Sequence, residues 1–118
     1  MKKHVIVRNN RDFTNIIETG KVYKNKFLVI YIKQNNYNKN RFGVTVGTKV
    51  GNAVIRNKFK RQIRNIVDNC KNFYSKDLDY IIIVRKSCLN ISYEELKDSF
   101  QKLIFNINKD IKGDSNEK

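Results

Sequence analysis

The stretch RFGVTVGTKVGNAVIRNKFKRQIR, residues 41–64, carries the most informative pattern in the chain. In residues 41–48 apolar side chains alternate with small or polar ones, which is typical of a β-strand. Further along, apolar side chains recur at helical spacing with cations between them. Asn52, directly after Gly51, is a suitable N-cap. The stretch therefore predicts a strand, a glycine-containing turn and a long helix that reaches about Asn72.

The predicted helix has an apolar face and a basic face. At about 100° per residue, one arc of the helical wheel collects the apolar side chains Ile55, Phe59, Ile63, Ile66, Val67 and Cys70. The basic face begins beside this arc with a ridge and continues round the wheel: Arg56, Lys60 and Arg64 form the ridge, followed by Asn57, Arg61 and Lys58. The apolar arc is expected to face the core.

The basic face is unfavourable for an isolated helix. Like charges four residues apart repel each other by a few tenths of a kcal/mol, and cations near a helix N-terminus oppose the macrodipole. A solvent-exposed helix face normally mixes charge signs, whereas Asp68 is the only acid here. Phosphate groups of a partner would supply the missing counterions. Lys49 and the backbone N–H groups of residues 47–52 form a further position that suits an anion.

The rest of the chain predicts a small α/β domain. A short helix in DFTNIIET (residues 12–19) can be capped by Asn10 or Asp12 and ended by Gly20 in the left-handed conformation. KFLVIYIK (residues 26–33) predicts a strand, which we expect to pair antiparallel with residues 41–48. DYIIIV (residues 79–84) predicts a strand covered on both faces, and the capping-box pair Ser92 and Glu95 begins a last helix that reaches about Asn108.

These elements predict one domain over residues 1–118. Their order is α-β-β-α-β-α, which fits an α+β two-layer sandwich, and we expect residues 1–7 and 112–118 to be flexible. The length and the 40% of apolar residues suffice for one core and no more.

A formal charge of +14 points to a polyanionic partner, either a membrane surface or a nucleic acid. No apolar run approaches the ~20 residues of a membrane-spanning helix, and Arg8 and Arg11 interrupt any signal peptide. We therefore expect a cytoplasmic protein with no membrane partner. Cys70 and Cys88 are then reduced thiols, and with His4 as the single histidine they predict no metal site.

Aromatic side chains matter because single-stranded nucleic acid is bound by stacking as well as by charge. On the strand of residues 26–33, Leu28, Ile30 and Ile32 form an aliphatic face that suits the main core. Tyr31 and Lys33 lie on the opposite face, where Phe13 of the first helix can join them. The alternative is that these aromatics complete a second, smaller core.

The sequence predicts no catalytic centre in the protein. Hydrolysis of RNA by protein groups needs paired acids or histidines, or carboxylates that hold metal ions. The acids are scattered: Asp77 and Asp79 flank the start of a strand, where turn and capping roles are common, and Glu94 and Glu95 fit the first turn of a helix. No helix-turn-helix or zipper indicates DNA binding.

From about residue 5 to residue 108 the chain resembles the bacterial ribonuclease P protein component. The family's hallmark is an Arg-Asn-x-x-Lys-Arg-x-x-Arg helix that follows a Lys-x-Gly-Asn-type connection. The matching residues are Lys49, Gly51, Asn52, Arg56, Asn57, Lys60, Arg61 and Arg64. The chain departs from the family at Ile17, where a second aromatic is usual, at Thr48, where a lysine is usual, and at Lys58, where an arginine is usual.

The resemblance implies a noncatalytic subunit of a ribonucleoprotein endoribonuclease. Its RNA subunit, with bound magnesium and no organic cofactor, cleaves precursor tRNA to release the 5′ leader. It also implies a left-handed β-α-β crossover, like that of a small-subunit ribosomal protein domain. The residues implied to bind the RNA subunit are Lys49, Asn52, Arg56, Asn57, Lys58, Lys60, Arg61 and Arg64. Those implied for the leader cleft are Phe13, Ile17, Tyr31 and Lys33.

Two other functions remain open on the sequence. A structural RNA-binding protein of ribosomal type would use the same basic helix on ribosomal RNA without a role in cleavage. A nuclease made of protein alone is disfavoured, because the sequence lacks a cluster of acids and histidines.

Overall fold

The most apolar strand of the chain lies at the centre of its sheet. In the computed structural model, which describes residues 5–6, 10–35, 39–70 and 77–116, β5 (Leu78–Val84) lies between β4 (Arg41–Val46) and β3 (Leu28–Gln34). All residues of β5 except Ile83 are buried. The prediction of a strand covered on both faces is confirmed.

The five strands of the sheet follow the order β1-β4-β5-β3-β2, with β1 at Val5–Ile6 and β2 at Lys21–Lys24. β3 is antiparallel to β2 and to β5, whereas β4 is parallel to β1 and to β5. The predicted antiparallel pairing of β3 with β4 is therefore wrong, because β5 lies between them. A strand without polar alternation is best buried at the sheet centre, and the intervening helix allows β4 and β5 to pair in parallel.

The two edge strands were missing from the predicted order α-β-β-α-β-α. β2 has the sequence KVYK and is largely exposed, so it lacks the apolar run that identifies a strand, and its lysines are typical of a sheet edge. β1 pairs with the start of β4 and falls within residues 1–7, which were expected to be flexible. Flexibility at either end of the chain stays a prediction.

Within the described residues, the sheet is accompanied by three α-helices and one 3-10 helix: α1 (Asn10–Thr19), α2 (Ala53–Asn69), η2 (Lys86–Asn90) and α3 (Tyr93–Asn116). The Asn52 side chain caps α2 by accepting a hydrogen bond from the backbone N–H of Ile55 at 3.1 Å. The Ser92 hydroxyl caps α3 by accepting one from Glu95 at 3.2 Å. α2 ends at Asn69, and the expected end near Asn72 lies outside the described residues. α3 continues beyond the expected end near Asn108 to Asn116.

Gly20 follows α1 for a different reason from the one predicted. No described glycine has a positive φ, so the left-handed conformation is wrong. A Cβ at Gly20 would lie 2.4 Å from the Ile16 carbonyl oxygen and 2.6 Å from that of Ile32. The position therefore needs a residue without a side chain, because the end of α1 and β3 meet there.

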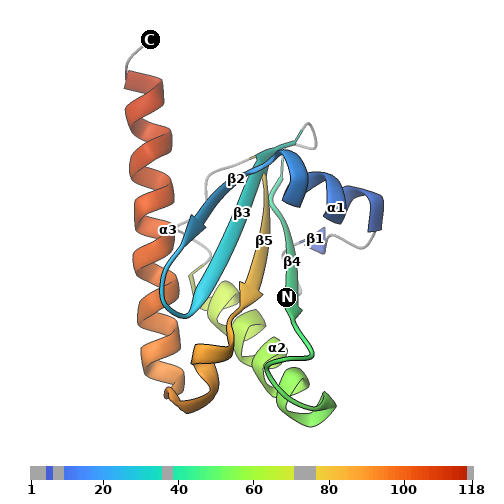
Figure 1. Ribbon diagram of the computed structural model, residues 1–118. Coiled ribbons are helices and arrows are strands. Elements are labelled where there is room, and N and C mark those ends of the chain that lie inside the picture. The colour runs from blue at the N-terminus through green and yellow to red at the C-terminus, as the bar shows by residue number, and fades with distance from the viewer. Residues whose placement is uncertain (1–4, 7–9, 36–38, 71–76, 117–118) are drawn as a thin grey trace.

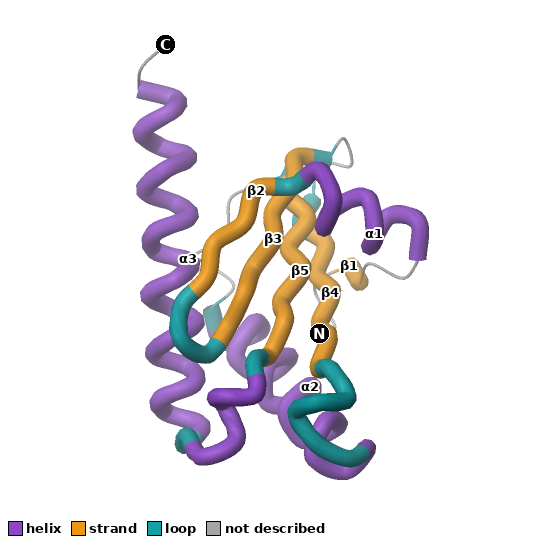
Figure 2. Tube along the Cα trace, in the orientation of Figure 1, coloured by secondary structure: helices purple, strands orange, loops and turns teal. Residues whose placement is uncertain are grey.

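The helices divide unequally between the two faces of the sheet (Figure 1 and Figure 2). On one face Leu28, Ile30 and Ile32 of β3 join the main core with residues of α2 and α3. On the other face Ile16 of α1 and Ile81 of β5 centre a smaller cluster. The mixed α/β class is confirmed, whereas the left-handed crossover from β4 through α2 to β5 stays a prediction.

Candidate RNA-binding surfaces

The helical wheel of α2 is confirmed by the burial of its side chains. Phe59, Ile63, Ile66 and Val67 are buried against the main core. Asn57, Lys58, Arg61 and Arg64 are exposed, and Arg56 and Lys60 are half-buried. Packing of the apolar face therefore turns the predicted basic face of α2 outward.

The basic face of α2 contains a shallow hollow of about 590 Å³. Its lining residues come from about three turns of the helix: Asn57, Lys60, Arg61, Arg64, Asn65 and Asp68. Within the described residues, no ion pair joins a cation of α2 to a carboxylate. Arginine guanidinium groups bind phosphate oxygens through paired N–H donors, so this surface can bind a phosphate backbone.

Arg56 and Asn52 also hold the start of α2 in place. Arg56 Nε donates a hydrogen bond to the Gly51 carbonyl oxygen at 3.2 Å, while Asn52 serves as the N-cap. Lys49 is exposed on the connection that precedes them. Of the eight residues predicted to bind the RNA subunit, Asn52 and Arg56 therefore also have a structural role. The cap at Asn52 was predicted from the sequence, whereas the Arg56 contact was not.

Three of the four predicted cleft residues meet on the opposite face of the sheet. Phe13, Ile17 and Tyr31 are half-buried and pack around Ile16 and Ile81. This arrangement fits the smaller core that the sequence left open, and it leaves each of the three residues partly accessible.

Gly43 of β4 lets the Phe13 ring approach the sheet. A Cβ at Gly43 would lie 3.0 Å from Phe13 Cε2 and 2.9 Å from Ile81 Cδ1. A glycine inside a strand often marks such a close approach, and this signal was present in the sequence.

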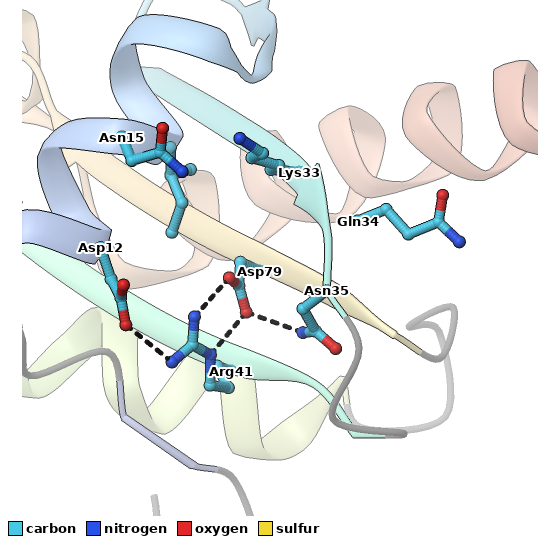
Figure 3. A pocket seen from close by; sticks show the side chains of 8 residues that line it. Asp12, Asn15, Lys33, Gln34, Asn35, Arg41 and Asp79 are labelled. Atoms are coloured by element: carbon cyan, nitrogen blue, oxygen red, sulfur yellow. Dashed lines mark hydrogen bonds and ion pairs between the residues drawn. The ribbon is translucent and has the colours of Figure 1, made fainter.

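Lys33, the fourth predicted cleft residue, lies beside this cluster and lines a polar hollow of about 390 Å³ (Figure 3). Its Nζ donates a hydrogen bond to Thr19 Oγ1 at 2.6 Å. The other lining residues come from α1, the end of β3, and the starts of β4 and β5: Asp12, Asn15, Ile16, Gln34, Asn35, Arg41 and Asp79.

A buried ion-pair network forms one wall of the polar hollow (Figure 3). Arg41 donates from Nε to Asp79 Oδ1 at 2.8 Å and from Nη2 to Asp79 Oδ2 at 2.6 Å. Its Nη1 donates to Asp12 Oδ2 at 3.2 Å, and Asn35 Nδ2 donates to Asp79 Oδ1 at 2.8 Å. Asp79 is only 3% exposed. Buried charges are tolerated when they are paired and hydrogen-bonded in this way.

Sequence reasoning missed this network. Arg41 and Asp79 are register partners in the parallel pair of β4 and β5, so the signal was a pair of opposite charges near the starts of two apolar strands. Because β4 was expected to pair with β3, these charges were not placed together, and Asp79 was interpreted as a turn or capping residue.

A metal site and a membrane-spanning helix were both considered in the sequence. Within the described residues, no three His, Cys, Asp or Glu side chains gather closely enough to hold a metal ion. No described helix is long and apolar enough to cross a membrane. Cys70 and Cys88 are free and buried, and burial raises the pKa of the Cys88 thiol to about 11.

Comparison with known proteins decides the family. The model of the family described as Ribonuclease P matches residues 1–108. The chain belongs to the ribonuclease P protein family. This result confirms the resemblance seen in residues 41–64, and with it the role of a protein component of ribonuclease P in tRNA processing.

Individual members of the family cover most of the chain. The ribonuclease P protein component of Mycoplasma mycoides is 43% identical over 88% of this chain and 96% of its own length, and that of Streptococcus pneumoniae is 38% identical over 82% and 79%. The structure of the Staphylococcus aureus RNase P protein matches with a TM-score of 0.80 and 30% identity, over 89% of this chain and 96% of that chain. As a family member, the chain takes part in a ribonucleoprotein and has an RNA subunit as its partner.

Proposed function

We propose that this chain binds the ribonuclease P RNA subunit through the basic face of α2 and holds the single-stranded 5′ leader of precursor tRNA beside α1. The observation that carries the proposal is the exposed basic face of α2, whose cations pair with no described carboxylate. The proposed RNA-subunit contacts are Lys49, Asn52, Arg56, Asn57, Lys58, Lys60, Arg61 and Arg64.

The leader is assigned to the other face of the sheet. Phe13 and Tyr31 are half-buried aromatics on which unpaired bases can stack. Ile17 gives an apolar contact in place of a second aromatic on α1, and Lys33 supplies a cation at the edge of the cluster. A leader base stacked here would distinguish precursor tRNA from mature tRNA, which lacks the leader.

Cleavage itself is assigned to the RNA subunit. The carboxylates that line the hollow beside the cleft, Asp12 and Asp79, both accept hydrogen bonds from Arg41, so they do not form an open metal site. Magnesium ions bound with the RNA subunit supply charge neutralisation for phosphodiester hydrolysis. The residues of this chain bind and orient the two RNAs, and we propose no DNA partner.

Replacing Tyr31 by alanine tests the leader contact. Affinities of the assembled ribonucleoprotein are measured for precursor tRNA and for mature tRNA, because only the precursor carries a leader. We expect Tyr31→Ala to weaken precursor binding by ~1–3 kcal/mol, the value of one base stack, and to leave mature tRNA unchanged. The control is Phe105→Ala, since Phe105 is an exposed aromatic on α3, which packs against the main core on the other face of the sheet. Equal losses of affinity for precursor and mature tRNA would mean that Tyr31 has only a structural role.

A further inference from the structure

We propose that Asp79 is a positioning residue for leader recognition, because this one buried carboxylate connects α1 and β3, the two elements that carry Phe13 and Tyr31 and form the walls of the proposed leader site. The inference rests on the proposed leader-binding role of Phe13 and Tyr31. Asp79 itself lies beneath the polar hollow and need not touch the leader.

The first wall is α1, which Asp79 reaches through Arg41. The guanidinium is held by two hydrogen bonds to Asp79 and reaches Asp12 in the first turn of α1 with a third (Figure 3). Phe13 follows Asp12 directly in the chain, so the position of this turn sets where its ring lies over Gly43. The ion pair between Arg41 and Asp79 is largely shielded from solvent, because the Arg41 side chain is 13% exposed and the Asp79 side chain 5%.

The second wall is β3, which Asp79 reaches through Asn35. The Asn35 amide donates one hydrogen bond to Asp79 and one to the Lys39 carbonyl oxygen at 3.1 Å. Its backbone N–H donates to the Asp77 carbonyl oxygen at 2.7 Å. Asn35 directly follows β3, the strand that carries Tyr31 and Lys33. The end of this strand is therefore fixed to the start of β5.

Charge-assisted hydrogen bonds hold the connection between α1 and β3 in place. Asp79 accepts three hydrogen bonds from two side chains, and charge-assisted hydrogen bonds in a shielded site are stronger than neutral ones. Removing the carboxylate charge leaves Asp12 as the acid partner of the Arg41 guanidinium within the described residues, and an uncompensated buried charge is costly. We expect the guanidinium to move toward solvent and to take the first turn of α1 with it.

Substitutions at both ends of the network test the proposal in the ribonucleoprotein assembled with its RNA subunit. We expect Asp79→Asn to weaken precursor-tRNA binding about tenfold, which corresponds to ~1.4 kcal/mol, with mature tRNA and RNA-subunit binding unchanged. Asp12→Ala removes only the half-exposed ion pair between Arg41 and α1. This variant should weaken precursor binding about two- to fivefold. If Asp79→Asn fails to fold, Asp12→Ala still provides the test.

A double variant distinguishes a positioning role of Asp79 from a nonspecific loss of structure. If Asp79 acts by placing the cleft walls, Asp79→Asn combined with Tyr31→Ala should lose less precursor affinity than the product of the two single losses. The matched control is Asp98→Asn, which breaks the exposed ion pair with Lys102 on α3 and should leave the precursor preference unchanged.

Three results would overturn the proposal. They are an unchanged precursor preference in both folded single variants, an equal loss for precursor and mature tRNA, and full additivity with Tyr31→Ala. If Tyr31→Ala shows a leader-specific loss and the network variants do not, positioning by Asp79 fails while the leader site stands. If Tyr31→Ala shows none, the proposed leader site itself fails.

Discussion

Single cations on α2 differ in what they can contribute to RNA binding. Arg61 and Arg64 are exposed and line the hollow, whereas Arg56 donates to the Gly51 carbonyl oxygen and helps to hold the helix start. We expect Arg64→Ala to weaken binding of the RNA subunit and to reduce the slope of log K against log salt by ~1, since one phosphate contact is lost. The measurement is a salt titration of binding, with Lys102→Ala on α3 as the control. An unchanged slope would show that Arg64 contacts no phosphate.

Cys88 gives a prediction that depends on pH. Its thiol is buried, it donates to the Phe27 carbonyl oxygen at 3.1 Å, and its pKa is raised to about 11 by loss of solvent. Only the thiolate is alkylated, so at pH 8 about 0.1% of the folded protein should be reactive at this site. Reaction with iodoacetamide, followed peptide by peptide, should rise about tenfold per pH unit up to pH ~11. A plateau near pH 9 in the folded protein would contradict the burial.

The element that could best be predicted from sequence is α2. Its cap at Asn52, its apolar stripe and its basic face all depend on residues within a few turns of one another, and the structure confirms them. The strand partners could not be predicted in the same way, because pairing depends on residues far apart in the chain. β5 joins the sheet after α2 and separates β3 from β4. Because the pairing of β4 with β5 was not predicted, the contact between Arg41 and Asp79 was missed as well.

The caps of α2 and α3 allow helix stability to be separated from RNA binding. Asn52→Asp keeps an acceptor for the Ile55 N–H and adds a negative charge at a helix N-terminus, so stability should be unchanged or higher by a few tenths of a kcal/mol. The added charge should still weaken RNA-subunit binding, because it faces the proposed phosphates. Ser92→Ala removes the cap of α3 and should cost about 1 kcal/mol of stability without affecting RNA binding. Thermal unfolding and binding titrations check both, and tight RNA binding by Asn52→Asp would argue against a contact at this cap.

Across the whole molecule, positive charge is concentrated away from α3. Between Glu18 and Asp68 the sequence has twelve lysines and arginines and no acid, whereas α3 has five acids against four cations. The long helix beside the β2 edge is therefore close to neutral (Figure 1), and the remaining elements carry the net charge of the molecule. This distribution agrees with a polyanion bound at the basic face of α2.

The same distribution predicts that anions stabilise the free protein. Sulfate bound at the basic face of α2 would relieve like-charge repulsion, and a binding contribution of about 1 kcal/mol would raise the Tm by ~4–8 °C. The comparison is with chloride at equal ionic strength, which screens charge without occupying a phosphate-like position. A variant with Lys60→Gln and Arg64→Gln should lose part of the sulfate effect. Equal Tm values in the two salts would mean that no anion site of this kind exists.

Cleavage of precursor tRNA by the cognate ribonuclease P RNA, measured at low magnesium with and without this protein, tests the account most directly. Added protein should enhance cleavage, and the enhancement should shrink for Arg61→Ala and Arg64→Ala, which weaken docking on the RNA subunit. The highly purified protein alone should cleave nothing. Unchanged cleavage on adding the protein would contradict the account, and so would RNA cleavage by the protein alone that one carboxylate substitution abolishes.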